Sequence, residues 1–285
     1  MKTLKREPIG IREGIPIFSE VDPYIENYSK IASNHLSLSN GGKGNPWISK
    51  RKWNEMEDST IYLVKRYSES MIVDRNGLKI LDVGVGLGRL LNKIRNTVPN
   101  IREFHGMDIA MPYLRVSKSK GFDVVLSKIE DIPYSEGYFD MVTCTDVLEH
   151  VIDLNLCVSK ILSVIRPGGY LIVRVPNRED LGPYMAPDYP YFLAHLRTFD
   201  LNSIKILFVK AFGLEFVESS PGLLVGNPSL FKCRLPFTAI HKLISGALKV
   251  VLYISKKKYQ ELLSLLYYPT EINVVFKKPL KSVFI

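Results

Sequence analysis

The stretch Ile80-Leu-Asp-Val-Gly-Val-Gly-Leu-Gly-Arg-Leu-Leu91 decides the fold of this chain. Its first residues are typical of a buried β-strand, its glycines of a tight loop, and its last residues of the start of a helix. Glycine lets the backbone turn sharply and lets a ligand approach without meeting a Cβ atom. Because ligands of open α/β sheets bind at the carboxyl ends of the strands, the stretch predicts a nucleotide-like ligand on a parallel sheet.

Two common phosphate-binding patterns do not fit this loop. A dinucleotide pattern Gly-x-Gly-x-x-Gly that starts at Gly84 requires a glycine at Arg89, and one that starts at Gly86 requires it at Leu91. The Gly-Lys-Ser/Thr end of a triphosphate loop is also absent from the stretch. Asp82 stands directly before the loop, and its charge suits a ligand with a cationic part, such as an amine or a sulfonium.

Strands and helices alternate from this stretch onward. The alternation predicts an α/β fold, a mostly parallel sheet with helices on both faces. The expected strands are 79–83, 103–108, 123–127, 138–143, 170–175, 214–219 and 271–277, and the expected helices are 89–97, 112–120, 153–165 and 200–211. A turn is expected at Pro167-Gly-Gly169. The last strand is a candidate antiparallel partner at the edge of the sheet.

The pattern divides the chain into four parts. Residues 1–77 are expected to form an irregular arm, to about residue 20, and a helical cap; residues 78–229 form the core. Residues 230–269 are a helical insertion, and 270–285 are the last strand and tail. Within the insertion, 235–258 carries an apolar stripe and a lysine triplet, but Lys242 and Lys249 argue against a membrane span. A lid on the acceptor pocket is preferred there; a dimer contact and a helix on a membrane surface are the alternatives.

Composition narrows the class of protein. The net charge of +9 comes from 38 basic and 29 acidic residues, and a basic surface attracts nucleic acid, anionic membrane or acidic substrates. No basic run is interleaved with aromatic residues, so an enzyme with a mildly basic face is favoured over a nucleic-acid platform. The three cysteines, Cys144, Cys157 and Cys233, are far apart, which favours a reducing cytoplasm and predicts no metal site. Residues 1–8 lack the apolar core of a signal peptide.

Asp108 ends the next expected strand, about twenty residues after the glycine loop. At that distance an acidic residue reaches the ribose hydroxyls in nucleotide-binding sheets. The alternative is that Asp108 caps the helix that follows. Together with the loop, the ribose role is favoured.

Five motifs in order resemble one family. They are Leu81-Asp-Val-Gly-Val-Gly-Leu-Gly88, Gly106-Met-Asp-Ile109, Glu130-Asp-Ile-Pro-Tyr134 with Tyr138-Phe-Asp140, Asp146-Val-Leu-Glu-His-Val151 and Arg166-Pro-Gly-Gly-Tyr170. Residues 78–176 thereby resemble a class I S-adenosylmethionine-dependent methyltransferase of the small-molecule group, types 11 and 23, that includes ubiquinone-biosynthesis enzymes. The resemblance implies a Rossmann-like, seven-stranded, mostly parallel sheet and S-adenosylmethionine as the cofactor.

The resemblance also implies roles for individual residues. Gly84, Gly86 and Gly88, with Asp82 before them, line the methionine part of the cofactor. Asp108 takes the ribose, with Ile109 beside it, and Asp131 and Ile132 flank the adenine. Thr145 and Asp146 lie against the methionine end. For Asp131, a turn residue before Pro133 is the alternative.

Methyl transfer from a sulfonium is an in-line displacement, for which the enzyme mainly aligns the two reactants and excludes water. An oxygen acceptor must also lose a proton, and histidine is the natural base near neutral pH. His150 and His195 are the catalytic candidates, with a structural role favoured for His150. In the resembled group a His-x-Arg-x-Phe stretch, here His195-Leu-Arg-Thr-Phe199, stands beside the acceptor pocket. Arg197 is read either as a ligand of an anionic acceptor or as the partner of a nearby acid.

The expected function is methyl transfer to a small-molecule acceptor, a sugar, lipid, quinone or other metabolite. The alternatives are an RNA or protein methyltransferase and a non-catalytic cofactor-binding protein. The Asn/Asp-Pro-Pro-Tyr/Phe signature of amino-group acceptors is missing after the fourth strand, where Thr143-Cys-Thr-Asp-Val147 stands. Residues 177–191, rich in proline and tyrosine, are expected to carry substrate contacts. Tyr24 and Tyr28 are candidates to close over the cofactor, or to lie in the core.

Overall fold

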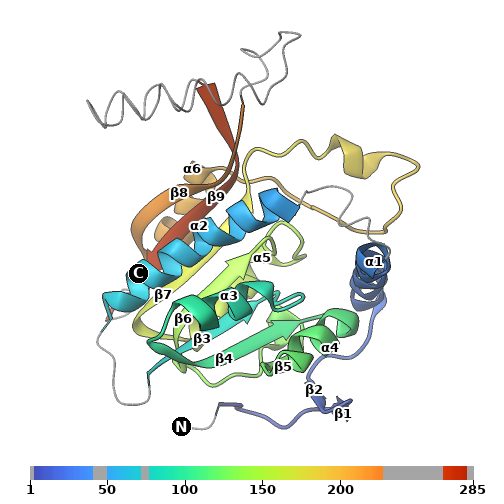
Figure 1. The fold of residues 1–285 in the computed structure, drawn as a ribbon, viewed down its shortest axis with the longest axis horizontal. Helices are drawn as coiled ribbons and strands as arrows, with labels where there is room; N and C mark the ends of the chain where they lie inside the picture. The colour runs from blue at the N-terminus through green and yellow to red at the C-terminus, as the bar shows by residue number, and fades with distance from the viewer. Residues whose placement is uncertain (1–2, 41–49, 72–76, 227–265, 281–285) are drawn as a thin grey trace.

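The computed structural model describes residues 3–40, 50–71, 77–226 and 266–280. In these residues one nine-stranded sheet has the order β1-β2-β5-β4-β3-β6-β7-β9-β8 (Figure 1). Its strands are β1 (Gly10–Arg12), β2 (Ile15–Ile17), β3 (Leu78–Val83), β4 (Ile101–Asp108), β5 (Asp123–Leu126), β6 (Phe139–Thr145), β7 (Ile165–Pro176), β8 (Glu215–Gly226) and β9 (Tyr267–Lys277). Strands β2, β5, β4, β3, β6 and β7 pair in parallel, whereas β9 pairs antiparallel with both β7 and β8.

The helices lie on both faces of the sheet. They are α1 (Pro23–Asn40), α2 (Lys50–Glu69), α3 (Arg89–Thr97), α4 (Met111–Ser119), α5 (Leu154–Val164) and α6 (Leu201–Lys205), with the 3₁₀ turns η1 (Ile129–Asp131) and η2 (Gly182–Met185) and the π-helical turn η3 (Ile206–Ala211). Leu81 and Val83 of β3 pack in the core that contains α5 and α6, whereas Leu78 and Ile80 pack in the core that contains α2, α3 and α4. This alternation follows from the strand period of two, which turns successive side chains to opposite faces.

The seven-stranded, mostly parallel α/β sheet predicted from the sequence is confirmed as the strands β3 to β9. Strand β9 is antiparallel, but it lies between β7 and β8 and not at the sheet edge. Two further strands were not predicted: β1 and β2 form a hairpin within the arm read as irregular, and Ile17 pairs with Leu126 of β5. The expected turn at 167–169 lies within β7, and the expected helix 200–211 is a short α-helix continued by a π-helical turn.

The N-terminal helical cap is present as α1 and α2. Helix α1 stands beyond the carboxyl ends of the parallel strands, next to the loop that contains η2, while α2 crosses one face of the sheet (Figure 1). The predicted lid or membrane-surface segment 235–258, and the predicted helical insertion up to residue 265, lie outside the described residues. Among the residues that are described, no helix has the length and apolarity that crossing a membrane requires.

Candidate active site

The glycine loop joins β3 to α3 at the carboxyl end of the sheet. Gly84, Gly86 and Gly88 all have left-handed φ angles, of 74°, 50° and 65°. A Cβ atom at Gly84 would lie 2.3 Å from Val147 Cγ2, so this glycine permits close packing against the turn after β6. A Cβ atom at Gly86 would meet only the carbonyl oxygen of Gly84, at 4.0 Å. Gly86 therefore faces open space, which is what a loop that cradles a ligand requires.

Asp108, at the end of β4, turns its carboxylate toward this loop. Its Oδ2 accepts a hydrogen bond from the Gly86 N–H at 2.9 Å, and its Oδ1 accepts one from the Ala110 N–H at 2.8 Å. Burial raises the pKa of Asp108, and these backbone hydrogen bonds oppose the rise. Strands β3 and β4 are neighbours in the sheet, so the pairing places the acid and the loop side by side. Ile109 follows as a partly buried residue.

Asp82 lies beneath the glycine loop, inside the sheet. Its side chain is 2% exposed, and Thr143 on the neighbouring strand β6 donates a hydrogen bond to its Oδ1 at 2.7 Å. Burial raises the pKa of Asp82 to about 7, although the Thr143 hydroxyl and the charge of Arg174 act in the opposite direction. Asp82 can therefore change its charge near neutral pH when a cationic group approaches.

Asp131 and Ile132 have neighbours that the sequence did not reveal. Ser19 Oγ donates a hydrogen bond to Asp131 Oδ2 at 2.7 Å, and Arg6 donates to the Asp131 carbonyl oxygen at 2.6 Å. The carboxylate thus fastens the N-terminal arm to η1. Ile132 is 1% exposed and packs in the core, so its side chain is not presented to a ligand in this arrangement.

The turn after β6 brings Thr145 and Asp146 next to the glycine loop. Asp146 has a left-handed φ of 56°, and Arg174 of β7 donates two hydrogen bonds to its carboxylate, of 3.0 and 2.6 Å. Arg174 is 2% exposed and also donates to Thr60 Oγ1 of α2 at 3.0 Å. The sequence analysis missed Arg174. Its signal was a single charge in the apolar strand 170–175, since a buried arginine needs an anionic partner.

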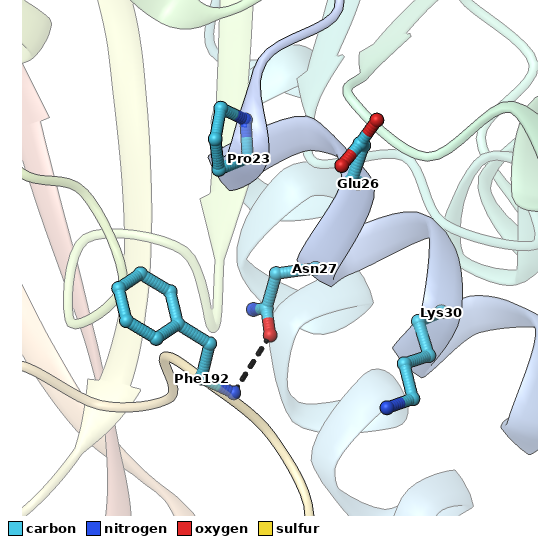
Figure 2. Close-up of a pocket in the computed structure, with 5 residues that line it drawn as sticks. All are labelled: Pro23, Glu26, Asn27, Lys30 and Phe192. Carbon is cyan, nitrogen blue, oxygen red and sulfur yellow. Dashed lines mark hydrogen bonds between the residues drawn. The ribbon is translucent and has the colours of Figure 1, made fainter.

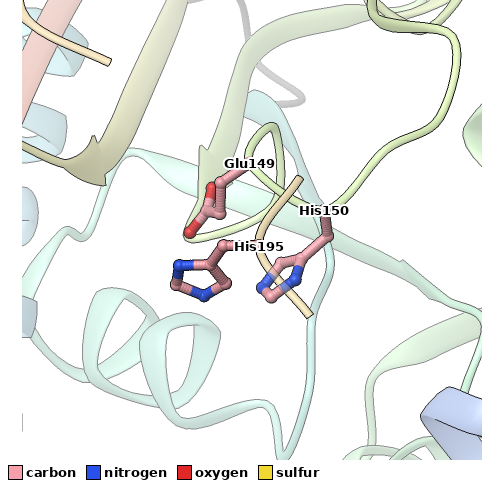
Figure 3. A group of neighbouring side chains, drawn as sticks. All are labelled: Glu149, His150 and His195. Carbon is pink, nitrogen blue, oxygen red and sulfur yellow. The ribbon is translucent and has the colours of Figure 1, made fainter. Parts of the chain in front are cut away.

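Three side chains meet at the end of this turn: Glu149, His150 and His195, named here the Glu–His–His cluster (Figure 3). One ligand atom from each lies within 4.8 Å of those of the other two, and the two imidazole rings are 4.5 Å apart between centroids. The Leu196 N–H donates to the Glu149 carbonyl oxygen at 2.8 Å, which holds the two segments together. The structure thus brings together the two histidines that the sequence proposed for catalysis.

Each histidine of the cluster is held by its Nδ1 atom. His150 Nδ1 forms hydrogen bonds with Tyr28 Oη, at 3.0 Å, and with the Ala194 carbonyl oxygen, at 3.3 Å. His195 Nδ1 forms hydrogen bonds with Glu179 Oε2 and with Tyr184 Oη. Burial, together with the neighbouring His195, lowers the pKa of His150 to about 4.

Glu149 is the buried acid of the cluster. Its side chain is 1% exposed, and neither carboxylate oxygen accepts a hydrogen bond from the described residues. Burial, with the negative charge of Asp146, raises the pKa of Glu149 well above its usual value. In Figure 3 its carboxylate points toward the His195 ring. From the sequence, Glu149 was named only as part of a family motif, and Glu179 was not identified.

Among the described residues Arg197 is hydrogen-bonded to the backbone and not to the nearby acid considered from the sequence. Its guanidinium donates hydrogen bonds to the backbone carbonyl oxygens of Leu148, at 2.8 Å, and Ile152, at 3.1 Å, and to that of Val151. It therefore secures the segment that carries Glu149 and His150.

Helix α1 closes one side of this region. Asn27 receives a hydrogen bond from the Phe192 N–H at 3.0 Å and donates one to the Leu193 carbonyl oxygen, also at 3.0 Å. An open depression next to this contact is lined by Pro23, Glu26, Asn27, Lys30 and Phe192 (Figure 2). None of its lining residues belongs to the glycine loop, so the depression is not the loop's ligand site.

A glycine loop at the end of a central parallel strand, with an acid at the end of the neighbouring strand, defines a class of Rossmann-like proteins that bind a nucleoside-containing cofactor. A family model described as a methyltransferase domain matches residues 52–219, more than half of the chain. The chain therefore belongs to the methyltransferase domain family of S-adenosylmethionine-dependent enzymes.

Curated proteins agree with this membership. The chain is 30% identical over 110 residues to the ubiquinone biosynthesis O-methyltransferase of Bordetella avium, covering 36% of this chain and 44% of that protein. It is 28% identical over 142 residues to the ubiquinone/menaquinone biosynthesis C-methyltransferase of Vibrio campbellii, covering 47% and 54%. The chain thus spans about half the length of these relatives.

A similar fold occurs in a solved complex between the Trm112 methyltransferase activator and a methyltransferase of Haloferax volcanii. The TM-score is 0.59 at 12% identity, over 92% of this chain and 100% of that one. At this identity the likeness shows the fold alone.

Proposed function

We propose that this chain moves a methyl group from S-adenosylmethionine to an oxygen atom of a small-molecule acceptor. The observation that carries the proposal is the contact between the glycine loop and the turn after β6. Gly84 packs against Val147, and the Val147 carbonyl oxygen accepts a hydrogen bond from the His150 N–H at 3.0 Å. The predicted cofactor loop therefore packs against the same turn that carries Glu149 and His150 of the Glu–His–His cluster.

The glycine loop suits the cofactor. The space that a Cβ atom at Gly86 would fill lies open, and Asp108 offers its carboxylate beside it. A carboxylate binds two neighbouring ribose hydroxyls with charge-assisted hydrogen bonds. We assign Asp82, Thr145 and Asp146 to the methionine end of the cofactor and Asp131 to its adenine end, as the resemblance to the family implies. When bound, the cofactor supplies a methyl group already activated by a cationic sulfonium.

The chain's own residues then provide alignment and a proton acceptor. In the transfer, the acceptor oxygen bonds to the methyl carbon while the carbon–sulfur bond breaks, its electron pair staying on sulfur. The acceptor's hydroxyl proton passes to His195, whose Nδ1 is held by Glu179 so that Nε2 is free. The Glu179 carboxylate stabilises the imidazolium that forms. His150, with its lowered pKa, stays neutral near pH 7 and orients the turn.

The acceptor class follows from the relatives and the site. Proteins that share this domain act in ubiquinone and menaquinone biosynthesis on oxygen or carbon. A histidine beside the predicted methyl position favours the oxygen acceptor, because a phenol-type hydroxyl must lose its proton before or during transfer. A hydroxylated aromatic ring is therefore the proposed acceptor, ahead of a sugar or a lipid.

Calorimetric titration of the full chain with S-adenosylmethionine and S-adenosylhomocysteine tests the cofactor. We expect both to bind wild-type protein, and Asp108→Ala to bind about 10- to 100-fold more weakly, the loss of a charged hydrogen-bond pair. Wild-type protein that binds neither compound would defeat the proposal.

Transfer of labelled methyl groups to catechol, with ortho-phenylenediamine as the nitrogen analogue, tests the acceptor atom. We expect label on the diol, and turnover about 10²- to 10⁴-fold lower in His195→Ala at unchanged S-adenosylhomocysteine affinity. Label on the diamine alone would refute an oxygen acceptor, and unchanged turnover would remove His195 from the reaction.

A further inference from the structure

Glu149 poses an electrostatic problem that the proposed reaction does not solve. Its side chain is 1% exposed, and among the described residues neither carboxylate oxygen has a hydrogen-bond donor. Buried carboxylates are normally paired with donors or bind cations, since desolvation without compensation is costly. Two nearby arginines have other partners: Arg174 binds Asp146 and Thr60, and Arg197 binds backbone carbonyl oxygens.

The surroundings of Glu149 supply ligands for a cation. Its carboxylate points toward the His195 ring, and His150 lies alongside (Figure 3). One ligand atom of each of the three lies within 4.8 Å of the others. A divalent ion bound at about 2.1 Å from each ligand requires ligand atoms at most about 4.2 Å apart. A contraction of less than about 1 Å would therefore seat such an ion.

The groups hydrogen-bonded to the two histidine rings also suit a metal site. His150 Nδ1 is engaged by Tyr28 Oη and the Ala194 carbonyl oxygen, and His195 Nδ1 by Glu179 and Tyr184. In metal sites the ring nitrogen that does not bind the ion contacts a carboxylate, carbonyl or hydroxyl group, which fixes the ring and its tautomer. With these contacts on Nδ1, Nε2 of each ring is the atom that we assign to the ion.

We propose that Glu149, His150 and His195 bind one divalent transition-metal ion, of the Zn²⁺ or Co²⁺ type. Two imidazoles and one carboxylate form a donor set typical of such ions, and three protein ligands leave a position open for an oxygen ligand. The sequence predicted no metal site because its three cysteines are far apart. His150 and His195 lie 45 positions apart (195 − 150) and meet only in the fold.

The open position gives the ion a role at the acceptor, and this step rests on the proposed function. Bound there, the ion would lower the pKa of an acceptor hydroxyl group, whose proton would leave to water. With the ion bound, His195 would be one of its ligands, whereas in the ion-free chain it keeps the role of base proposed above. The binding of the ion itself does not depend on the reaction.

Titration of the chelator-treated full chain with Co²⁺, followed by visible absorption, tests the site. We expect one ion per chain with a tetra- or five-coordinate spectrum, competed by Zn²⁺. Glu149→Gln and His195→Ala should each weaken binding at least tenfold. His105→Gln is the matched control, because His105 contacts Glu103 and lies outside the cluster. Retained binding of S-adenosylhomocysteine shows that each variant is folded.

Two results would overturn the metal site. One is wild-type protein without stoichiometric Co²⁺ or Zn²⁺ binding, and the other is binding that Glu149→Gln and His195→Ala leave unchanged. Methyl transfer to catechol, measured with and without EDTA, separates this inference from the proposed function. Transfer that persists in EDTA sinks the ion's role at the acceptor and leaves the methyltransferase intact. Ion binding to a chain that binds no cofactor supports the site and refutes the function.

Discussion

The substitution Gly86→Ala separates ligand binding from folding at the glycine loop. Gly86 has a left-handed φ of 50°, and an added Cβ atom would find its nearest neighbour, the Gly84 carbonyl oxygen, at 4.0 Å. The methyl group therefore strains the backbone by about 1–2 kcal/mol without a steric clash inside the protein. For a chain of this size we expect the melting temperature to fall by about 2–8 °C.

The same methyl group projects into the space assigned to the cofactor. We expect the Kd for S-adenosylhomocysteine to rise at least about tenfold, equivalent to about 1.4 kcal/mol. Calorimetric titration and thermal unfolding measure the two effects on one sample. Gly137→Ala is the matched control: its φ is 61°, its Cβ atom would lie 3.7 Å from Arg166 Cα, an ordinary contact, and it precedes β6 at the amino end of that strand. The control should lose similar stability and keep wild-type affinity. If Gly86→Ala also keeps wild-type affinity, the placement of the cofactor at this loop is wrong.

Three further outcomes follow from the same geometry. Gly84→Ala should lose about 1–3 kcal/mol more unfolding free energy than Gly86→Ala in urea, because its Cβ atom would lie 2.3 Å from Val147; equal losses would contradict this. The folded chain holds a proton on Asp82 up to pH about 7, whereas an unperturbed aspartate releases it near 3.8, so this residue's contribution to stability falls as pH rises between those values. Between pH 5 and pH 8, the unfolding free energy measured in urea should fall less in Asp82→Asn than in wild type. Equal falls in the two proteins would refute the raised pKa of Asp82. Arg174→Met should lower the unfolding free energy by about 3–5 kcal/mol in the same assay, because the Asp146 carboxylate then has lost its charged partner. The double variant with Asp146→Asn should recover part of this loss. A double variant without recovery would show that the ion pair is not the cause.

Local pattern predicted the elements of the fold well, as at the glycine loop. Helix α3 spans Arg89–Thr97, the range expected from its apolar spacing, because Leu90, Leu91 and Ile94 form one buried face. The position of β9 between β7 and β8 was missed, since nothing in a strand's own residues specifies its neighbours. The hairpin of β1 and β2 was missed because three-residue strands leave too little alternation to detect.

The candidate site was predictable where it is local in sequence and unpredictable where it depends on tertiary contact. Asp108 follows the loop at a fixed strand-to-strand spacing, so its position beside Gly86 could be expected. The contact of Asp131 with Ser19 joins residues 112 positions apart, and that of His195 with Glu149 joins two different crossover connections. Their proximity is set by the path of the chain, which residue spacing does not encode.

The close packing of Gly84 against Val147 has a consequence for engineering the enzyme toward other acceptors. Because this contact joins the ends of β3 and β6, the spacing between the glycine loop and the turn after β6 is fixed by the sheet and not by the surrounding loops. The wall formed by Asn27 of α1 and the backbone at Phe192 and Leu193 belongs to neither strand, although Tyr28 of the same helix is hydrogen-bonded to His150. Substitutions in this wall should therefore change which acceptor is admitted while the reacting groups keep their spacing. A designed library of variants should therefore change the residues of this wall and keep Gly84 and Val147 unchanged.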